Sequence, residues 1–122
     1  MSANPSPGFR KHPDYRIAVA PAGKRVTVDF AGTTIADTRD ALAMKEGDYP
    51  VVYYVPRKDV KMDRLERSAH STHCPFKGDA SYFSLKDGPR DAVWSYERPF
   101  DEMAAIREYL AFYPDKVEIK AG

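Results

Sequence analysis

The most reactive side chains of this sequence gather in the segment 57–78, which holds the only cysteine and two of the three histidines. Imidazole and thiolate are the ligands that zinc prefers, so His70, His73 and Cys74 are candidates for a metal site. The spacing His-x-x-His-Cys matches no common zinc pattern, and adjacent side chains such as those at 73 and 74 point apart on an extended backbone. The sequence therefore predicts no metal site and no other cofactor.

Cys74 is also a candidate nucleophile, with His70 or His73 as the base that would activate it. Lys77 lies three residues further on and would favour the thiolate, and it is itself a candidate for group transfer. Against this, a lone cysteine is usually a small buried apolar side chain, and the following Pro75-Phe76 favours a rigid, packed turn. We expect a structural Cys74, and whether the chain is an enzyme stays open at this point.

Aromatic side chains make up a second candidate site. Residues 80–85 and 92–96 alternate in hydrophobicity on either side of Lys86-Asp87-Gly88-Pro89, which predicts a β-hairpin. One face of this hairpin carries Tyr82, Trp94 and Tyr96, and the other carries Phe83, Leu85 and Val93. Tyr82 should lie across from Trp94 or Tyr96. The aromatic face then packs in a closed core, forms an interface or lines a pocket with its polar tips inward.

Short segments in which apolar and polar residues alternate, or in which β-branched residues predominate, predict a mainly β chain. These predicted strands position the candidate residues. The clearest is Val51–Val55, in which every residue is β-branched or aromatic and which is bracketed by prolines. Arg25–Phe30 and Thr33–Thr38 predict a hairpin across Ala31-Gly32. The other predicted strands are Tyr15–Ala20, Ala41–Lys45, Tyr109–Tyr113 and Lys116–Lys120.

The remaining segments predict a long loop and one short helix. Residues 57–78 combine charge, Ser, Thr, His and Pro without periodicity, so we expect mostly loop with a helical turn within Asp59–Leu65. Asp101–Glu108 is the predicted helix, because apolar residues recur in it at helical spacing and Asp101 can serve as its N-cap.

The length and composition of the chain indicate the number of domains and the classes of partner that it can bind. The 122 residues suit a single β-rich domain, residues 15–122, after a proline-rich stretch, 1–14, that we expect to be a flexible N-terminal arm. The net charge is +1 with both signs interspersed, so we expect no nucleic-acid partner. No apolar run reaches about eighteen residues and no signal-peptide pattern is present, so we expect a cytoplasmic protein without membrane contact.

Several motifs taken together resemble a known family. They are Val51-Val52-Tyr53-Tyr54-Val55-Pro56-Arg57-Lys58-Asp59-Val60, Thr72-His73-Cys74-Pro75-Phe76-Lys77-Gly78 with the strand after it, Ala92-Val93-Trp94-Ser95-Tyr96 and Ala111-Phe112-Tyr113-Pro114-Asp115. In these motifs the chain resembles the uncharacterised family called domain of unknown function 427, from about Arg25 to Lys120. The resemblance implies a mainly β domain with curved antiparallel sheets and one short helix, similar to the tent-like sheets of the Mss4-like superfamily.

The same family is also labelled a nucleotidyltransferase domain. Nucleotidyltransferases of the polymerase-β type use a Gly-Ser pair and an Asp-x-Asp motif to hold metal ions and phosphates. The chain has neither motif. Tent-fold relatives often hold zinc with two Cys-x-x-Cys pairs, which a chain with one cysteine cannot form.

The resemblance also marks a set of positions, namely Tyr54, Pro56, Arg57, Cys74, Lys77, Gly78, Tyr82, Trp94 and Tyr96. Their chemistry suggests an aromatic floor with Arg57 and Lys77 at its rim, suited to a small anionic or planar ligand. We expect this ligand-binding pocket between the Tyr54 strand and the predicted hairpin, with Arg57, Lys77, Tyr82 and Trp94 bordering one cavity. Two alternatives stay open: a group-transfer enzyme that uses Cys74 or Lys77, and a structural or interaction module whose aromatic face joins two copies in a homodimer.

Overall fold

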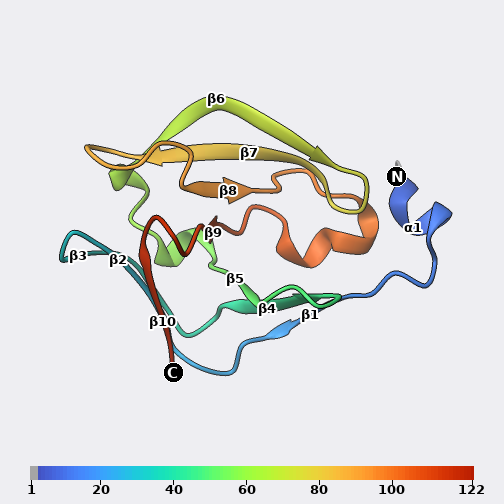
Figure 1. Cartoon of the computed structure of the whole chain (residues 1–122), viewed down its shortest axis with the longest axis horizontal. Coiled ribbons are helices and arrows are strands. Elements are labelled where there is room, and N and C mark those ends of the chain that lie inside the picture. The colour runs from blue at the N-terminus through green and yellow to red at the C-terminus, as the bar shows by residue number, and fades with distance from the viewer. Residues whose placement is uncertain (1–2) are drawn as a thin grey trace.

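Strands make up most of the regular structure in the computed structural model, which describes residues 3–122 (Figure 1). In chain order the elements are α1 (Pro7–Lys11), β1 (Ile17–Pro21), β2 (Val26–Phe30), β3 (Thr33–Thr38), β4 (Leu42–Glu46), β5 (Val52–Tyr54), η1 (Arg57–Asp59), η2 (Met62–Arg64), β6 (Leu65–Cys74), β7 (Gly78–Leu85), β8 (Val93–Ser95), η3 (Asp101–Ile106), β9 (Ala111–Phe112) and β10 (Glu118–Ala121), where η marks 3-10 helix. The mainly β character predicted from the sequence is confirmed. Within residues 3–122, no helix has the length and apolar character needed to cross a membrane.

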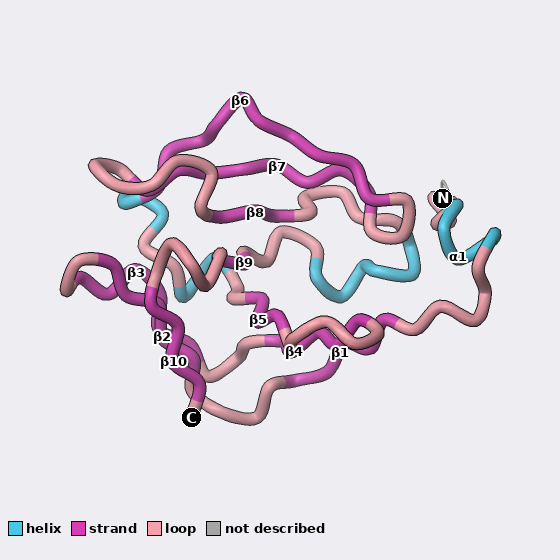
Figure 2. Tube along the Cα trace, viewed as in Figure 1, coloured by secondary structure: helices cyan, strands magenta, loops and turns pink. Residues whose placement is uncertain are grey.

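The strands of this part of the chain form three small antiparallel sheets (Figure 2). Their strand orders are β1-β4-β5, β10-β2-β3 and β6-β7-β8-β9. Two isolated bridges tie them together. Leu110, just before β9, pairs with Val55, just after β5, and Val60, between η1 and η2, pairs with Ala36 of β3. The backbone of β5 and the segment after it therefore connects all three sheets.

Both predicted hairpins are confirmed. In the β2–β3 hairpin, the turn residues Ala31 and Gly32 have φ of 49° and 80°, and positive φ at both central residues is what a two-residue turn of this hand requires. In the β7–β8 hairpin, Tyr82 pairs directly with Trp94. The register therefore places these two aromatic side chains on one face, as their alternation in the sequence predicts.

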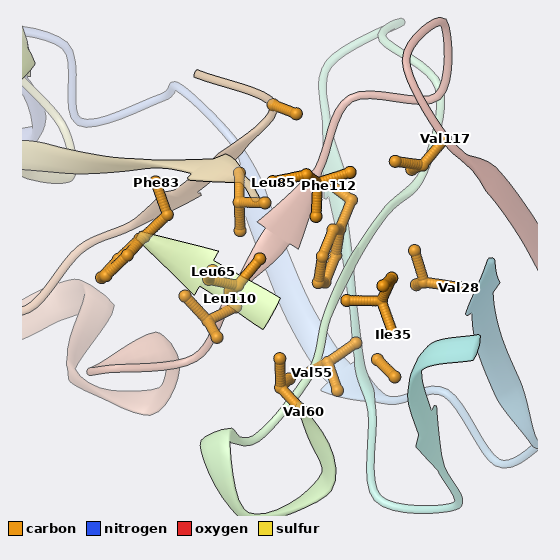
Figure 3. Close-up of a cluster of buried hydrophobic side chains, with 13 residues drawn as sticks. Val28, Ile35, Val55, Val60, Leu65, Phe83, Leu85, Leu110, Phe112 and Val117 are labelled. Atoms are coloured by element: carbon orange, nitrogen blue, oxygen red, sulfur yellow. The ribbon is translucent and has the colours of Figure 1, made fainter. Parts of the chain in front are cut away.

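The β7–β8 hairpin is covered on both faces. Phe83, Leu85 and Val93 point into a core that also receives side chains from β2, β3 and the segments around Val55 and Leu110 (Figure 3). Tyr82 and Tyr96 belong to a second buried cluster on the opposite face, together with side chains of β4, β5 and η3. The division between the two faces follows the sequence alternation, and the second cluster is the one that borders the candidate site.

The prediction that residues 57–78 are mostly loop is wrong. Two turns of 3-10 helix and the ten-residue strand β6 occupy most of this segment. β6 is an edge strand that pairs with β7, and most of its side chains are exposed on both faces. The strand therefore shows no hydrophobic alternation, because pairing of its backbone rather than burial of its side chains holds it in place. A bulge between Arg67 and Ser71 interrupts the pairing.

The N-terminal stretch also differs from the prediction of an extended, flexible arm over residues 1–14. Met1 and Ser2 lie outside the described residues. Ser6 is fully buried and caps α1, and its hydroxyl lies 3.0 Å from the carbonyl oxygens of both Pro75 and Phe76. Gly8 approaches the same turn closely, and a Cβ there would lie 2.7 Å from the Phe76 ring. The N-terminal segment is thus packed against the turn between β6 and β7.

The predicted helix Asp101–Glu108 is a shorter 3-10 helix, η3, with a kink at Met103. Asp101 is not its N-cap; Phe100 holds that position without a side-chain hydrogen bond. The Asp101 carboxylate instead accepts the backbone N–H of Asn4 at 2.8 Å. The acidic residue at the start of η3 therefore anchors the N-terminal segment rather than the helix.

Candidate functional site

A cavity of about 720 Å³ opens between the β4–β5 hairpin and the aromatic face of β7–β8. Its walls are mainly aromatic and include Tyr54, Tyr82, Trp94, Tyr96, Phe112 and Tyr113. A charged pair, Glu46 and Lys77, also lines it. The site thus combines flat apolar surface with a small number of polar groups, which is the usual make-up of a small-molecule pocket.

The aromatic side chains hold one another in place through their edges and hydroxyl groups. The Trp94 ring lies against the Tyr113 ring, with centroids 4.5 Å apart, and meets the Tyr54 ring edge-on at 6.4 Å. The indole Nε1–H of Trp94 donates a hydrogen bond to the Tyr54 hydroxyl at 3.3 Å. On the other side, the Tyr82 hydroxyl lies 3.4 Å from that of Tyr113 and 3.0 Å from Thr72 Oγ1. These contacts join β5, β7, β8 and the loop after β9 into one wall.

The charged pair is well screened from water. Lys77 Nζ donates to Glu46 Oε1 at 2.6 Å, and the two side chains are only 11 % and 19 % exposed. The Tyr15 hydroxyl donates to Glu46 Oε2 at 2.5 Å, and the Tyr15 ring stacks on Phe76 at 4.2 Å. Burial alone would raise the pKa of Glu46, but the hydrogen bonds from Lys77 and Tyr15 outweigh it and hold that pKa below its ordinary value. Glu46 is therefore a carboxylate at neutral pH.

Three tyrosines of the cavity wall, Tyr54, Tyr96 and Tyr113, and the neighbouring Tyr15 have raised pKa values. Burial raises the pKa of Tyr54 and of Tyr96, and it raises the pKa of Tyr113 to about 12. The hydrogen bond to Glu46 raises the pKa of Tyr15 to about 12. At neutral pH every one of these hydroxyls keeps its proton and can donate it.

The mouth of the cavity carries an apolar lip that sequence reasoning missed. Tyr49 and Val51 line the cavity and are 67 % and 45 % exposed, and they are the large hydrophobic side chains most open to solvent among residues 3–122. They flank Pro50 in the turn between β4 and β5. The signal was present in the sequence as two apolar residues beside a turn proline, but such a pair is also common at ordinary strand ends.

Comparison with protein families matches residues 18–121 to the family described as Domain of unknown function (DUF427). The chain belongs to this family. The match spans every residue that lines the cavity of this DUF427 domain, whereas Ser6 and Tyr15 precede it. Comparison with curated proteins gives no match.

Five of the sequence-predicted positions line the cavity of the DUF427 domain, namely Tyr54, Lys77, Tyr82, Trp94 and Tyr96. The expectation that Arg57 borders the same cavity is wrong. Its guanidinium packs over Phe83, whose side chain belongs to the core on the opposite face of β7. It donates to the Glu108 carbonyl at 2.7 Å and to Glu97 at 3.0 Å. The chain turns into η1 directly after Pro56, which carries residue 57 away from the cavity.

Cys74 does not line the cavity either. It is half-buried at the end of β6 and packs against the aromatic cluster. Neither nearby histidine is hydrogen-bonded to it: His73 pairs with Asp79 at 2.7 Å, and the His70 ring lies against Tyr82. Among the described residues, no three His, Cys, Asp or Glu side chains are grouped to hold a metal ion. A cysteine nucleophile needs a base within hydrogen-bond reach, and within the described residues the contacts of His70 and His73 are made to other groups.

Arg57 instead belongs to an ion-pair cluster centred on Glu97. Arg67 binds both oxygens of this carboxylate, at 2.9 and 2.8 Å, and Arg57 binds one of them at 3.0 Å. Together the hydrogen bonds from Arg67 and the charge of Arg57 lower the pKa of Glu97 from 4.5 to about 2. The cluster joins η1, β6 and the segment after β8, so its role is to hold these parts of the chain together.

We expect this cluster to make stability depend on pH in the acid range. A carboxylate whose pKa is lower in the folded state stabilises the fold above its unfolded pKa of about 4.5, and this contribution is lost as the pH falls toward about 2. Glu97→Gln should therefore lower the free energy of unfolding by about 1 kcal/mol at pH 7, a modest value because the pair is partly solvated, and should flatten the decline between these two pH values. Urea unfolding at a series of pH values measures both effects.

The matched control for this experiment is Glu118→Gln. Glu118 is exposed, and its contact with Lys120 is long at 3.5 Å. This variant should keep the acid dependence of the parent protein. Equal pH profiles for Glu97→Gln and the parent would show that the cluster does not carry the effect.

Proposed function

We propose that this DUF427 domain binds a small planar ligand in the aromatic cavity. The observation that carries the proposal is the cavity itself, whose volume of about 720 Å³ falls within the range of roughly 300–1,000 Å³ that small-molecule sites occupy. Its aromatic walls are held by hydrogen bonds between side chains of four different segments, so they present a preformed surface. Flat rings of this kind pack most closely on flat ligands.

The exposed lip supports the same proposal. Tyr49 and Val51 leave apolar surface in contact with water at the mouth of the cavity, although the other large apolar side chains of residues 3–122 are at least partly buried. Two residues are too few for a stable interface with a second copy, which needs about 800 Å² on each partner. A small ligand that reaches the mouth would cover this surface without a protein partner.

The structure gives no support to an anionic ligand, which was one of the two ligand types predicted from the sequence. The pocket was expected to carry two cations, but Arg57 lies on the opposite face and Lys77 is paired with Glu46. The cavity therefore offers an anion no unbalanced positive charge from these two residues. The β-tent arrangement of the sheets stays a prediction.

Trp94 makes the proposal directly testable, because it is the only tryptophan of the chain and lines the cavity. Its indole N–H gives a single, unambiguous signal in a ¹H–¹⁵N spectrum. Titration with the bicyclic aromatics quinoline, 2-naphthol and 2-naphthoate should shift this signal in a saturable manner for at least one compound. Glucose 6-phosphate, which is not planar, should leave it unchanged. Absence of saturation with all three aromatics would contradict the proposal.

Two tyrosine variants test whether the compounds bind in the cavity. Tyr113→Ala removes the ring that lies against Trp94 and should weaken binding by about tenfold, the effect of losing one aromatic contact and its buried area. Tyr109→Ala makes the same chemical change in the same cluster but outside the cavity, and should leave the affinity unchanged. Equal losses in both variants would mean that the compounds bind somewhere else.

A further inference from the structure

The polar groups around the cavity are unequally divided between donors and acceptors. The Tyr54 oxygen accepts the indole N–H of Trp94, which leaves the Tyr54 proton free to donate. Tyr96 lines the cavity, and none of the side-chain hydrogen bonds described for residues 3–122 involves its hydroxyl. The Lys77 ammonium has three protons and gives one of them to Glu46. Unused donors therefore lie at Tyr54, Tyr96 and Lys77.

The Glu46 carboxylate, which is the charged acceptor at this end of the cavity, already receives one hydrogen bond at each oxygen. Glu46 Oε1 accepts from Lys77 and Glu46 Oε2 accepts from Tyr15. Burial is the main cause that raises the pKa of Tyr54 and Tyr96, and the negative charge of Glu46 adds to it in both cases. Both hydroxyls are thus close enough to the ion pair to feel its carboxylate, and both keep their protons at neutral pH.

We propose that the ligand is a neutral planar heteroaromatic compound that directs a hydrogen-bond acceptor, a carbonyl oxygen or a ring nitrogen, toward Tyr54, Tyr96 and Lys77. This inference rests on the proposed function of the cavity. A hydrogen bond formed inside a mainly apolar cavity is stronger than one exposed to water, so a ligand that supplies an acceptor to these donors gains affinity. A ligand that brings only donors leaves the remaining protons of Lys77 and Tyr54 without an acceptor and gains less affinity.

The ligand should be neutral because of the geometry of the Lys77–Glu46 ion pair. The Lys77 ammonium and the Glu46 carboxylate are 2.6 Å apart and lie in the same wall. An anionic ligand that approached Lys77 would therefore also approach Glu46, and the repulsion would offset the attraction. A neutral acceptor receives a proton from Lys77 without meeting this repulsion.

Two isosteric probes separate this inference from the proposed function. Naphthalene and quinoline have the same shape and differ by one ring nitrogen, which is an acceptor. Hydrophobic transfer alone favours naphthalene, so tighter binding of quinoline reports the acceptor. Followed by the indole signal of Trp94 at pH 7.5, quinoline should bind about fivefold more tightly than naphthalene. The anion 2-naphthoate should bind no more tightly than quinoline.

The variant Tyr96→Phe tests the source of the preference. It removes a hydroxyl without a partner among the described residues and keeps the ring, so the fold should be retained. The ratio of quinoline to naphthalene affinity should fall by about twofold, because Tyr54 and Lys77 remain as donors. In Tyr109→Phe, the matched control outside the cavity, it should stay at its original value. A melting curve for each variant checks that it is folded.

Each remaining outcome has one meaning. Saturable binding of both probes with equal affinity overturns the acceptor inference and leaves the proposed function in place. Tightest binding of 2-naphthoate overturns it as well, in favour of an anionic ligand. No saturable shift with any probe overturns the proposed function, and the inference with it.

Discussion

Replacing Leu110 with alanine should lower the free energy of unfolding by about 2–5 kcal/mol, the range for removing a fully buried leucine side chain. Leu110 has no exposed surface and lies in the core between the sheets (Figure 3). Its backbone N–H and C=O both pair with Val55, at 2.8 Å in each direction, so it sits where two sheets meet. Side chains anchored from both sheets limit how far the site can collapse around the missing atoms, which favours the upper part of this range.

Urea unfolding monitored by Trp94 fluorescence measures this effect. Val51→Ala is the control, because Val51 is 45 % exposed at the cavity lip and contributes little to the core. Its free energy of unfolding should change by less than about 0.5 kcal/mol, as for most surface substitutions. A loss below about 1 kcal/mol in Leu110→Ala would mean that the three sheets are not held together by this core.

The parts of the fold that the sequence predicts correctly are those in which side-chain burial alternates along a strand. In β2, Val26 and Val28 are buried and Thr27 between them is not, and the corresponding pattern in β7–β8 assigns each side chain to the correct cluster. β6 was missed because it is an edge strand with mostly exposed side chains. The α1 segment was missed because Ser6 is buried by contacts with Pro75 and Phe76, about seventy residues away in the chain.

The same difference between local patterns and distant contacts explains which residues of the candidate site the sequence predicts. The aromatic positions follow from strand alternation, a local property. Glu46 does not, because it pairs with Lys77 across 31 residues and lies at the end of β4, a strand with weak sequence signal. Arg57 was misplaced for a related reason: a basic residue just after a strand can turn toward either face, and only the position of Glu97, forty residues later, decides which.

The second large effect concerns the ion pair that lines the cavity. Glu46→Ala should lower the free energy of unfolding by about 3 kcal/mol, because it leaves the Lys77 ammonium largely buried and without its counter-ion. This is the lower end of the range for buried pairs, since Lys77 keeps 11 % of its side-chain surface exposed. Lys45→Ala, on the same strand with an exposed side chain, is the control and should change stability little.

The double variant Glu46→Leu with Lys77→Met separates charge from packing. Apolar residues of similar volume often replace a buried ion pair at no cost, because neither charge then has to leave water. The double variant should therefore recover most of the stability lost in Glu46→Ala, with the half-buried Tyr15 hydroxyl turning to solvent. If it stays as unstable as Glu46→Ala, the loss comes from the Tyr15 hydrogen bond or from packing, and the unpaired charge is not its cause.

Recovery of stability in the double variant would bear directly on function. An ion pair that apolar residues can replace is not required for folding, and its position in the wall of the cavity then needs another reason. If Lys77 donates to the ligand, the double variant should keep most of the stability of the parent protein and yet bind quinoline more weakly by about twofold, with naphthalene affinity unchanged or higher. Unchanged quinoline affinity in a stable double variant would assign the pair to the fold alone and leave Tyr54 and Tyr96 as the only donors to the ligand.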